Sequence, residues 1–77
     1  MYAAYVLIDL STDVDFPETL EMIRGIAGVK QAHLAVGPND CIAYIEVADQ
    51  RKAIETLQAI RNIEGVVKTD TRPVAEM

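Results

Sequence analysis

The sequence predicts an α+β domain with the element order strand-helix-strand-strand-helix-strand. The first observation is an internal duplication, because residues 18–29 (ETLEMIRGIAGV) and 55–66 (ETLQAIRNIEGV) are identical at eight of twelve positions. Each copy follows an Ala-Tyr-aliphatic strand and precedes a short apolar or β-branched stretch. The second observation is a turn sequence, residues 37–40 (GPND), whose position between two apolar runs predicts a hairpin joining the halves. We therefore expect a ferredoxin-like fold, with a four-stranded antiparallel sheet in the order 4-1-3-2 and two helices on one face.

The first strand, residues 3–10, is apolar at nearly every position, which predicts burial on both faces. We expect Ala4, Val6 and Ile8 to face the helices and the intervening residues to face away. The duplication maps these intervening residues onto the third strand. The sheet face that no helix covers should therefore carry four large side chains near its centre: Tyr5, Leu7, Ile42 and Tyr44. Such a cluster is a candidate interface with a second subunit.

The first helix follows a polar connection. Asp15 and Glu18 have the spacing of a capping box, and Pro17 falls in the first turn. Apolar residues at helical spacing predict the buried stripe: Phe16, Leu20, Ile23 and Ala27. Gly25 and Gly28 are expected to loosen and then end the helix.

The second strand, residues 30–36, alternates as an edge strand does. One face should carry Ala32, Leu34 and Val36, and the other Gln31 and His33. We expect a tight turn next, with Pro38 at its second position and Asn39 at its third. The third strand, residues 41–47, is apolar up to Glu46, as a central strand should be.

The second helix is expected to begin after Asp49 as N-cap and to stop at Gly65. Its buried stripe is predicted to be Ala53 or Ile54, with Leu57, Ile60 and Ile63. The last strand, residues 67–74, should lie at the other edge of the sheet, because Pro73 has no N–H for a ladder hydrogen bond.

Length and charge narrow the classes of function. A chain of 77 residues suffices for one domain, residues 1–77, but its core is marginal, and Cys41 is its single cysteine. Self-association is then the usual source of extra stability. The net charge of −5 repels phosphate backbones, so we expect no direct contact with nucleic acid. The apolar start of the chain is too short to span a membrane and lacks a basic segment, so we expect a cytoplasmic protein.

The sequence offers no convincing catalytic or metal site. With one histidine and one cysteine, no nucleophile and base can be paired, and Cys41 is interpreted as a buried core residue. His33 alone does not make a metal site. The acidic residues before the first helix are explained by capping at Asp15 and by loop solvation at Asp9 and Asp13. We therefore expect no catalytic residue, no cofactor and no metal.

The hairpin connection allows two interpretations. The backbone N–H groups of Asn39, Asp40 and Cys41 could bind an α-carboxylate, while the Asp40 carboxylate could bind an ammonium group. Alternatively, the connection is a plain turn in which Asp40 and Asn39 satisfy nearby backbone groups.

The order and spacing of several motifs resemble one known family. The motifs that carry this resemblance are Val36-Gly37-x-x-Asp40 after an edge strand, followed by Ile63-x-Gly65-Val66 and Thr69-x-Thr71. The chain resembles the effector-binding RAM domain of the Lrp/AsnC feast/famine transcription regulators. The resemblance covers essentially the whole chain. It implies dimers formed through the sheet faces, rings of dimers, and binding of free amino acids or similar metabolites between dimers. Carried over by motif, the ligand residues would be Gly37, Asn39, Asp40, Thr69 and Thr71.

The resemblance implies a sensor rather than an enzyme. No helix-turn-helix precedes the first strand here, so we expect a stand-alone form that does not touch DNA. It would modulate either its own oligomerisation or a full-length Lrp/AsnC-type regulator. Two departures are Glu64, where the family often has proline, and Pro38, which removes a donor from the connection. The alternatives are an ACT-type amino-acid-binding domain, a small dimeric α+β-barrel enzyme with a histidine or acid in its pocket, and a ring-forming scaffold.

Overall fold

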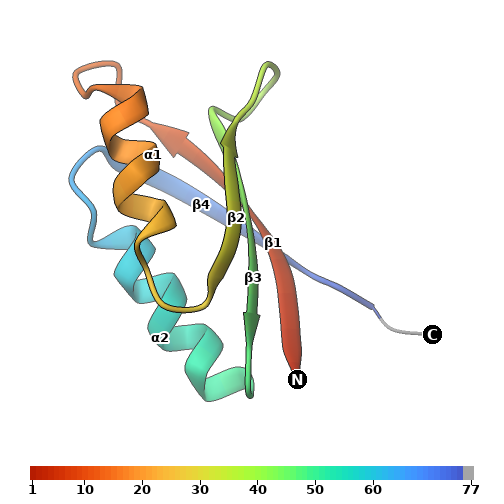
Figure 1. Cartoon of the computed structure of the whole chain (residues 1–77). Helices are drawn as coiled ribbons and strands as arrows, with labels where there is room; N and C mark the ends of the chain where they lie inside the picture. The colour runs from red at the N-terminus through yellow and green to blue at the C-terminus, as the bar shows by residue number, and fades with distance from the viewer. Residues whose placement is uncertain (76–77) are drawn as a thin grey trace.

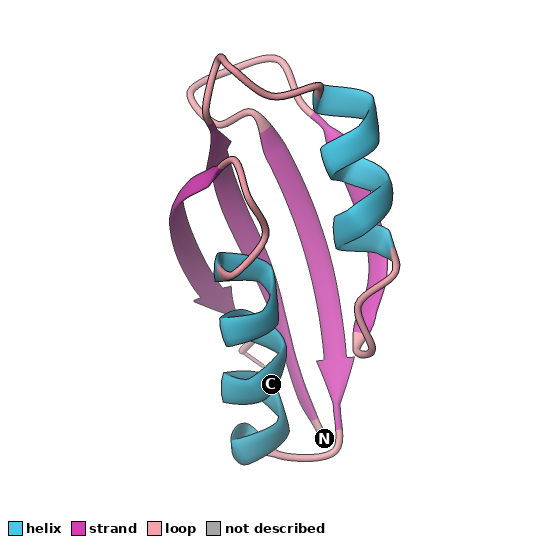
Figure 2. Ribbon diagram, turned by 90° about the vertical axis from the view of Figure 1, so that its left-hand side faces the viewer, coloured by secondary structure: helices cyan, strands magenta, loops and turns pink. Residues whose placement is uncertain are grey.

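The computed structural model, which describes residues 1–75, has the predicted element order. The elements are β1 (Tyr2–Leu10), α1 (Phe16–Arg24), β2 (Val29–Leu34), β3 (Cys41–Val47), α2 (Gln50–Arg61) and β4 (Val66–Pro73). They form one antiparallel sheet in the order β2-β3-β1-β4, which confirms the predicted order 4-1-3-2. Both helices cover the same face of this sheet (Figures 1 and 2). The ferredoxin-like fold is therefore confirmed.

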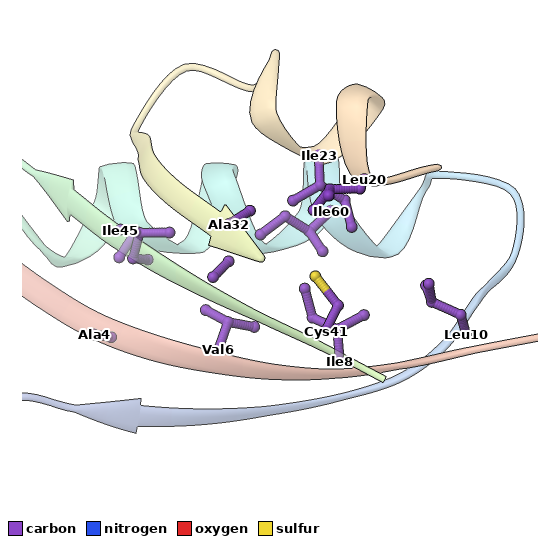
Figure 3. Packing of buried hydrophobic residues seen from close by; sticks show 12 residues of the cluster. Ala4, Val6, Ile8, Leu10, Leu20, Ile23, Ala32, Cys41, Ile45 and Ile60 are labelled. Carbon is purple, nitrogen blue, oxygen red and sulfur yellow. The ribbon is translucent and has the colours of Figure 1, made fainter. Parts of the chain in front are cut away.

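The core lies between β1, β3 and the two helices. Ala4, Val6 and Ile8 of β1 are fully buried, as predicted for the residues that face the helices. Figure 3 shows them below Ile23 of α1 and Ile60 of α2, which are also fully buried. The buried apolar residues form one cluster that joins the sheet to both helices.

Both helices begin at the predicted caps. Asp15 Oδ1 accepts the N–H of Glu18, and Asp49 Oδ1 accepts the N–H of Lys52, each at 2.9 Å. The buried stripe of α2 uses Ala53 rather than Ile54, whose side chain is 52% exposed. The helix-end predictions need correction, because α1 ends at Arg24 and α2 at Arg61. The predicted stripe residues Ala27 and Ile63 therefore lie in the turns that follow.

The turns after the two helices repeat one conformation. Gly28 and Gly65, which are equivalent in the duplication, have φ of +99° and +100°. In each turn the residue after the glycine donates its N–H to a carbonyl three positions earlier, Val29 to Ile26 O and Val66 to Ile63 O, at 3.1 Å in both cases. The duplication seen in the sequence is thus a duplication of backbone geometry.

The hairpin differs from the prediction. β2 ends at Leu34, so the connection is the loop of residues 35–40 rather than a tight turn, and Val36 is fully exposed in it. The N–H of Ala35 donates to Asp40 O at 2.9 Å and closes this loop. Gly37 has the positive φ, +149°, whereas Asn39 keeps a negative φ. The reason is that Asp40 pairs with the neighbouring strand β1 instead of turning the chain.

The two outer strands are protected at their free edges. On β2, the Nε–H of Arg24 donates to Ala32 O at 2.9 Å and occupies an outward-pointing carbonyl. On β4, the register with β1 shifts at Leu10 and Val66, and Pro73 removes a donor near the other end. A capped carbonyl, an irregular register and a proline are features that discourage edge-to-edge pairing.

Replacement of Gly65 by alanine should destabilise the fold. The new Cβ would lie 2.5 Å from Val14 Cγ1 at a backbone φ of +100°. We expect the free energy of unfolding to fall by about 1–3 kcal/mol. Gly25→Ala is the matched control, because Gly25 has φ of −79° and its new Cβ would meet nothing closer than 3.6 Å. Urea unfolding of both variants checks the prediction, and equal stability of the two would contradict it.

Candidate functional site

The loop of residues 35–40 lies at one end of the sheet, beyond the last residues of β1 (Figure 1). Asp40 ties the loop to that strand twice. Its N–H donates to Ile8 O at 3.0 Å, and its carboxylate oxygen Oδ2 accepts the N–H of Leu10 at 2.8 Å in a partly buried position. One of the two sequence interpretations left Asp40 free to bind a ligand, and the other had it satisfy nearby backbone groups. In the structure one of its carboxylate oxygens and its N–H bind the backbone of β1.

Asn39 is also held by β1. Its Nδ2 donates to Asp9 Oδ1 at 2.9 Å. Asp9 is not a solvated loop residue, as the sequence interpretation had it, but a residue of β1 opposite Lys68. Its side chain lies on the same side of the sheet as Tyr5 and Leu7. The alternation of residues 5, 7 and 9 along the strand is the sequence signal that could have predicted this position.

The loop therefore has fewer free backbone N–H groups for an anion than the sequence interpretation assumed. The N–H of Asp40 is used within the chain, and Pro38 has none to give. Two parts of the loop stay open to a ligand. The backbone around Gly37 is uncovered, since an added Cβ there would meet nothing within 4 Å. The carboxylate oxygen Oδ1 of Asp40 accepts no hydrogen bond from residues 1–75. A ligand on this loop would thus meet one carboxylate oxygen and open backbone.

Thr69 and Thr71 lie across β1 from the loop. They pair with Ile8 and Val6 of β1, whose buried side chains face the helices, so both threonines belong to the helix-covered face. The Thr69 hydroxyl accepts the Nε–H of Arg61 at 3.1 Å. Thr71 Oγ1 is buried and lacks a hydrogen-bond partner within the described chain. Two strand spacings, about 10 Å, separate these threonines from β3 and the loop that precedes it.

The five predicted ligand residues do not share a cavity in the single chain. A hollow of about 330 Å³ at the edge of β4 includes Thr69 but none of the other four, and it is lined by Arg61, Val66, Val67, Lys68 and Thr69. The loop and the two threonines therefore flank β1 from opposite sides. They remain predictions as ligand contacts.

The open sheet face carries the predicted aromatic and aliphatic cluster. Tyr5 pairs with Tyr44 and Leu7 pairs with Ile42 across the adjacent central strands. The two tyrosine rings lie 5.1 Å apart between centroids with an interplanar angle of 49°, and the Tyr44 hydroxyl donates to Glu46 Oε2 at 2.9 Å. Tyr5 is 49% exposed and Ile42 is 37% exposed.

Polar residues surround this cluster at both edges of the sheet. The register places Gln31 and His33 of β2 on one side, and Asp70 and Arg72 of β4 on the other. Arg72 Nη2 lies 2.9 Å from Asp70 Oδ2, and this hydrogen bond holds the pKa of the Asp70 carboxyl below its ordinary value. An apolar centre with a polar rim is the usual composition of a protein interface.

The remaining candidates for chemistry are isolated from one another. His33 is exposed on the open face of the sheet rather than directed into a closed cavity. Cys41 is fully buried, and burial raises the pKa of its thiol. Residues 1–75 hold no group of three or more His, Cys, Asp or Glu side chains placed to share a metal ion. Neither helix in the described chain has the length and apolar character needed to cross a membrane.

Comparison with known proteins gives one family. Residues 3–77 match the model of the Lrp/AsnC ligand binding domain. No curated protein matches the sequence significantly.

Several solved structures are similar to this chain in fold. TTHA0845 from Thermus thermophilus superposes with a TM-score of 0.90 and 26% identity over 100% of this chain and 96% of that one. The feast or famine regulatory protein Rv3291c from M. tuberculosis, solved with L-methionine, superposes with a TM-score of 0.83 and 19% identity. The match covers 100% of this chain and 52% of that one. E. coli AsnC superposes with a TM-score of 0.80 and 20% identity, over 99% of this chain and 52% of that one. This chain thus spans about half of the last two proteins and nearly all of the first.

Removal of the Asp40 carboxylate should weaken the fold as well as the loop. Asp40→Ala leaves the partly buried N–H of Leu10 without its acceptor, and we expect a loss of about 1–3 kcal/mol in the free energy of unfolding. Asp40→Asn keeps a side-chain oxygen at that place and should retain most of the stability. Urea titration measures both, and a fully stable Asp40→Ala variant would show that this hydrogen bond is unimportant.

Proposed function

The chain belongs to the Lrp/AsnC ligand-binding domain family, and on this premise we propose that it is a non-enzymatic sensor of an amino acid or a related small metabolite. The observation that carries the proposal is the family match over residues 3–77. The relative Rv3291c, solved with L-methionine, shares the fold along the whole chain and supports an amino acid as the ligand class. We place the function in the cytoplasm, where an unpaired cysteine such as Cys41 stays reduced.

The ligand is proposed to bind at a contact between subunits. The predicted contacts Gly37, Asn39 and Asp40 lie on an exposed loop, and Thr69 and Thr71 lie on the far side of β1, so one chain does not enclose a small molecule with them. A neighbouring subunit against this end of the sheet would supply the missing wall. The buried, unpartnered hydroxyl of Thr71 is consistent with a polar partner that the single chain lacks.

Dimers are proposed to form through the open sheet face, with Tyr5, Leu7, Ile42 and Tyr44 at the centre of the interface. These side chains offer apolar area that the single chain leaves partly in water. The remaining contacts would join dimers into a ring. A ligand then acts by binding one assembly more tightly than another, because equal affinity for both would shift nothing. Co-assembly with a full-length regulator of the same family would transmit that shift to transcription.

A thermal-shift screen of the twenty amino acids tests the ligand. A cognate amino acid at about 100 times its Kd should stabilise the protein by about 2.7 kcal/mol, which for a domain of this size raises the Tm by roughly 10 °C or more. The mass of the assembly is measured in parallel, and it should change with the same amino acid.

The loop residue Asp40 gives the matched comparison. Asp40→Asn removes the charge while keeping an acceptor for Leu10, so it should reduce the ligand-induced shift without unfolding the protein. Glu55→Gln removes a carboxylate from the exposed face of α2 and should leave the shift unchanged. Equal shifts in parent and Asp40→Asn would remove the loop from the ligand site.

A lysine in the open-face cluster should break the dimer. Ile42→Lys places a charge at the centre of the proposed interface, and we expect the dimer Kd to rise by about 30-fold or more, as for the loss of an interface hot spot. Ile54→Lys is the control, because Ile54 is a similarly exposed isoleucine on α2. Sedimentation equilibrium should show a lighter species for Ile42→Lys alone, and an unchanged mass would exclude this face as the interface.

A further inference from the structure

Three charged residues form a row across the loop end of the sheet. Asp9 of β1 pairs with Lys68 of β4 in the strand register, and Asp40 is bonded to the other side of β1 through Ile8 O and the N–H of Leu10. The side chain of Asp9 lies on the open face. Lys68 lies on that face with it, because cross-strand partners in an antiparallel sheet point to the same side. The row therefore consists of two carboxylates followed by one ammonium group.

Each carboxylate of the row is held through one oxygen. Asp9 Oδ1 accepts a hydrogen bond from Asn39 Nδ2 at 2.9 Å, and Asp40 Oδ2 accepts the N–H of Leu10 at 2.8 Å. The second oxygen of each carboxylate accepts no hydrogen bond from residues 1–75. These contacts fix the direction of both groups without using their full capacity as acceptors. Like charges on neighbouring strands also destabilise each other, and a cation between them would remove that cost.

Lys68 forms no ion pair within residues 1–75, although Asp9 is its cross-strand neighbour. Asp70 lies two positions along β4 on the same face, but Nε and Nη2 of Arg72 both donate to its Oδ2. The hydrogen bond from Arg72 is the largest cause that lowers the pKa of the Asp70 carboxyl, and the charge of Lys68 is the smallest. The ammonium group of Lys68 is therefore left for an anion at this end of the sheet.

We propose that this row of Asp40, Asp9 and Lys68 binds the charged end of a free α-amino acid. The ligand ammonium lies between the second carboxylate oxygens of Asp9 and Asp40, and the ligand carboxylate pairs with Lys68. The inference rests on the proposed function and deepens it, because it names the groups that recognise the ligand. It also assigns Lys68, rather than Thr69 or Thr71, as the ligand contact from β4.

The alternation of side chains along β4 supports this assignment. Thr69 belongs to the helix-covered face, so the neighbouring Lys68 is the residue whose side chain shares the open face with Asp9. An α-amino acid carries its ammonium and its carboxylate on one carbon, and Asp9 and Lys68 present the opposite charges on adjacent strands. Charge-assisted hydrogen bonds are stronger than neutral ones. A zwitterion gains them at both groups, whereas a simple amine or a simple carboxylate gains them at one.

Two-dimensional NMR titration of the full chain with L-methionine at millimolar concentration tests the proposal. The row recognises only the charged end that all α-amino acids share, so L-methionine should give saturable shifts at the amides of Asp9, Asp40 and Lys68. It should bind at least about tenfold more tightly than L-methioninol, which lacks the carboxylate, or 3-(methylthio)propionate, which lacks the ammonium group.

Lys68→Gln is the decisive variant, because it removes the charge that meets the ligand carboxylate. Affinity for L-methionine should fall at least about tenfold, while affinity for L-methioninol should stay within about twofold of the parent. Asp9→Asn keeps an acceptor for Asn39 and should weaken binding of both compounds. Lys30→Gln and Asp13→Asn are the matched controls, since they change exposed charges outside the row, and they should leave both affinities within about twofold of the parent.

The outcomes separate this inference from the proposed function. A loss of L-methionine binding in Lys68→Gln, with L-methioninol binding retained, supports the row. If Lys68→Gln and Asp9→Asn bind L-methionine as tightly as the parent does, the row is overturned while the sensor function stands. Equal affinity of the parent for L-methionine and L-methioninol overturns the assignment of Lys68. If L-methionine shifts no amide, the row is overturned, and the thermal-shift screen of the other amino acids decides the sensor function on its own.

Discussion

The structure depends on the pairing of β1 with both β3 and β4. Because β1 is central, one set of its side chains builds the core under the helices and the alternate set builds the open face. Its last residues also hold the loop of residues 35–40, through Ile8 O and Leu10 N–H. A change in the register of β1 would therefore disturb the core, the open face and the loop together.

The duplication explains both the order and the irregularities of the molecule. The glycine turns after α1 and α2 share one backbone conformation, since Gly28 and Gly65 have nearly the same φ. The helix-end arginines have diverged, because Arg24 bonds the backbone of β2 whereas Arg61 bonds the Thr69 hydroxyl of β4. The connections before the helices differ most, because residues 11–15 lead into α1 whereas only residues 48–49 lead into α2. Surfaces with different chemistry thus arise where the two copies depart from each other.

Two separate surfaces of this small domain bear on its proposed function. The open sheet face is apolar at the centre and polar at the rim. The loop of residues 35–40 extends past one end of the sheet (Figure 1). Because these surfaces use different side chains, the proposed association through the face would leave the loop available for contacts between dimers. A sensor needs such a division, since ligand contacts and assembly contacts must be coupled without being identical.

The sequence by itself determined the element order, the strand order, both N-caps and the side chains of β1 that face the helices. These features follow from the spacing of apolar and capping residues within short stretches of the chain and from the internal duplication. The sequence also grouped Tyr5, Leu7, Ile42 and Tyr44 correctly on one face, because their period of two survives in any antiparallel pairing of central strands. Only the tertiary structure decided that Asp40 and Asn39 bind β1, across thirty positions of sequence in each case, and that β2 ends at Leu34. It also decided that the two threonines of β4 lie apart from the loop. The physical reason is that these contacts depend on the register and length of neighbouring strands, which local periodicity does not specify.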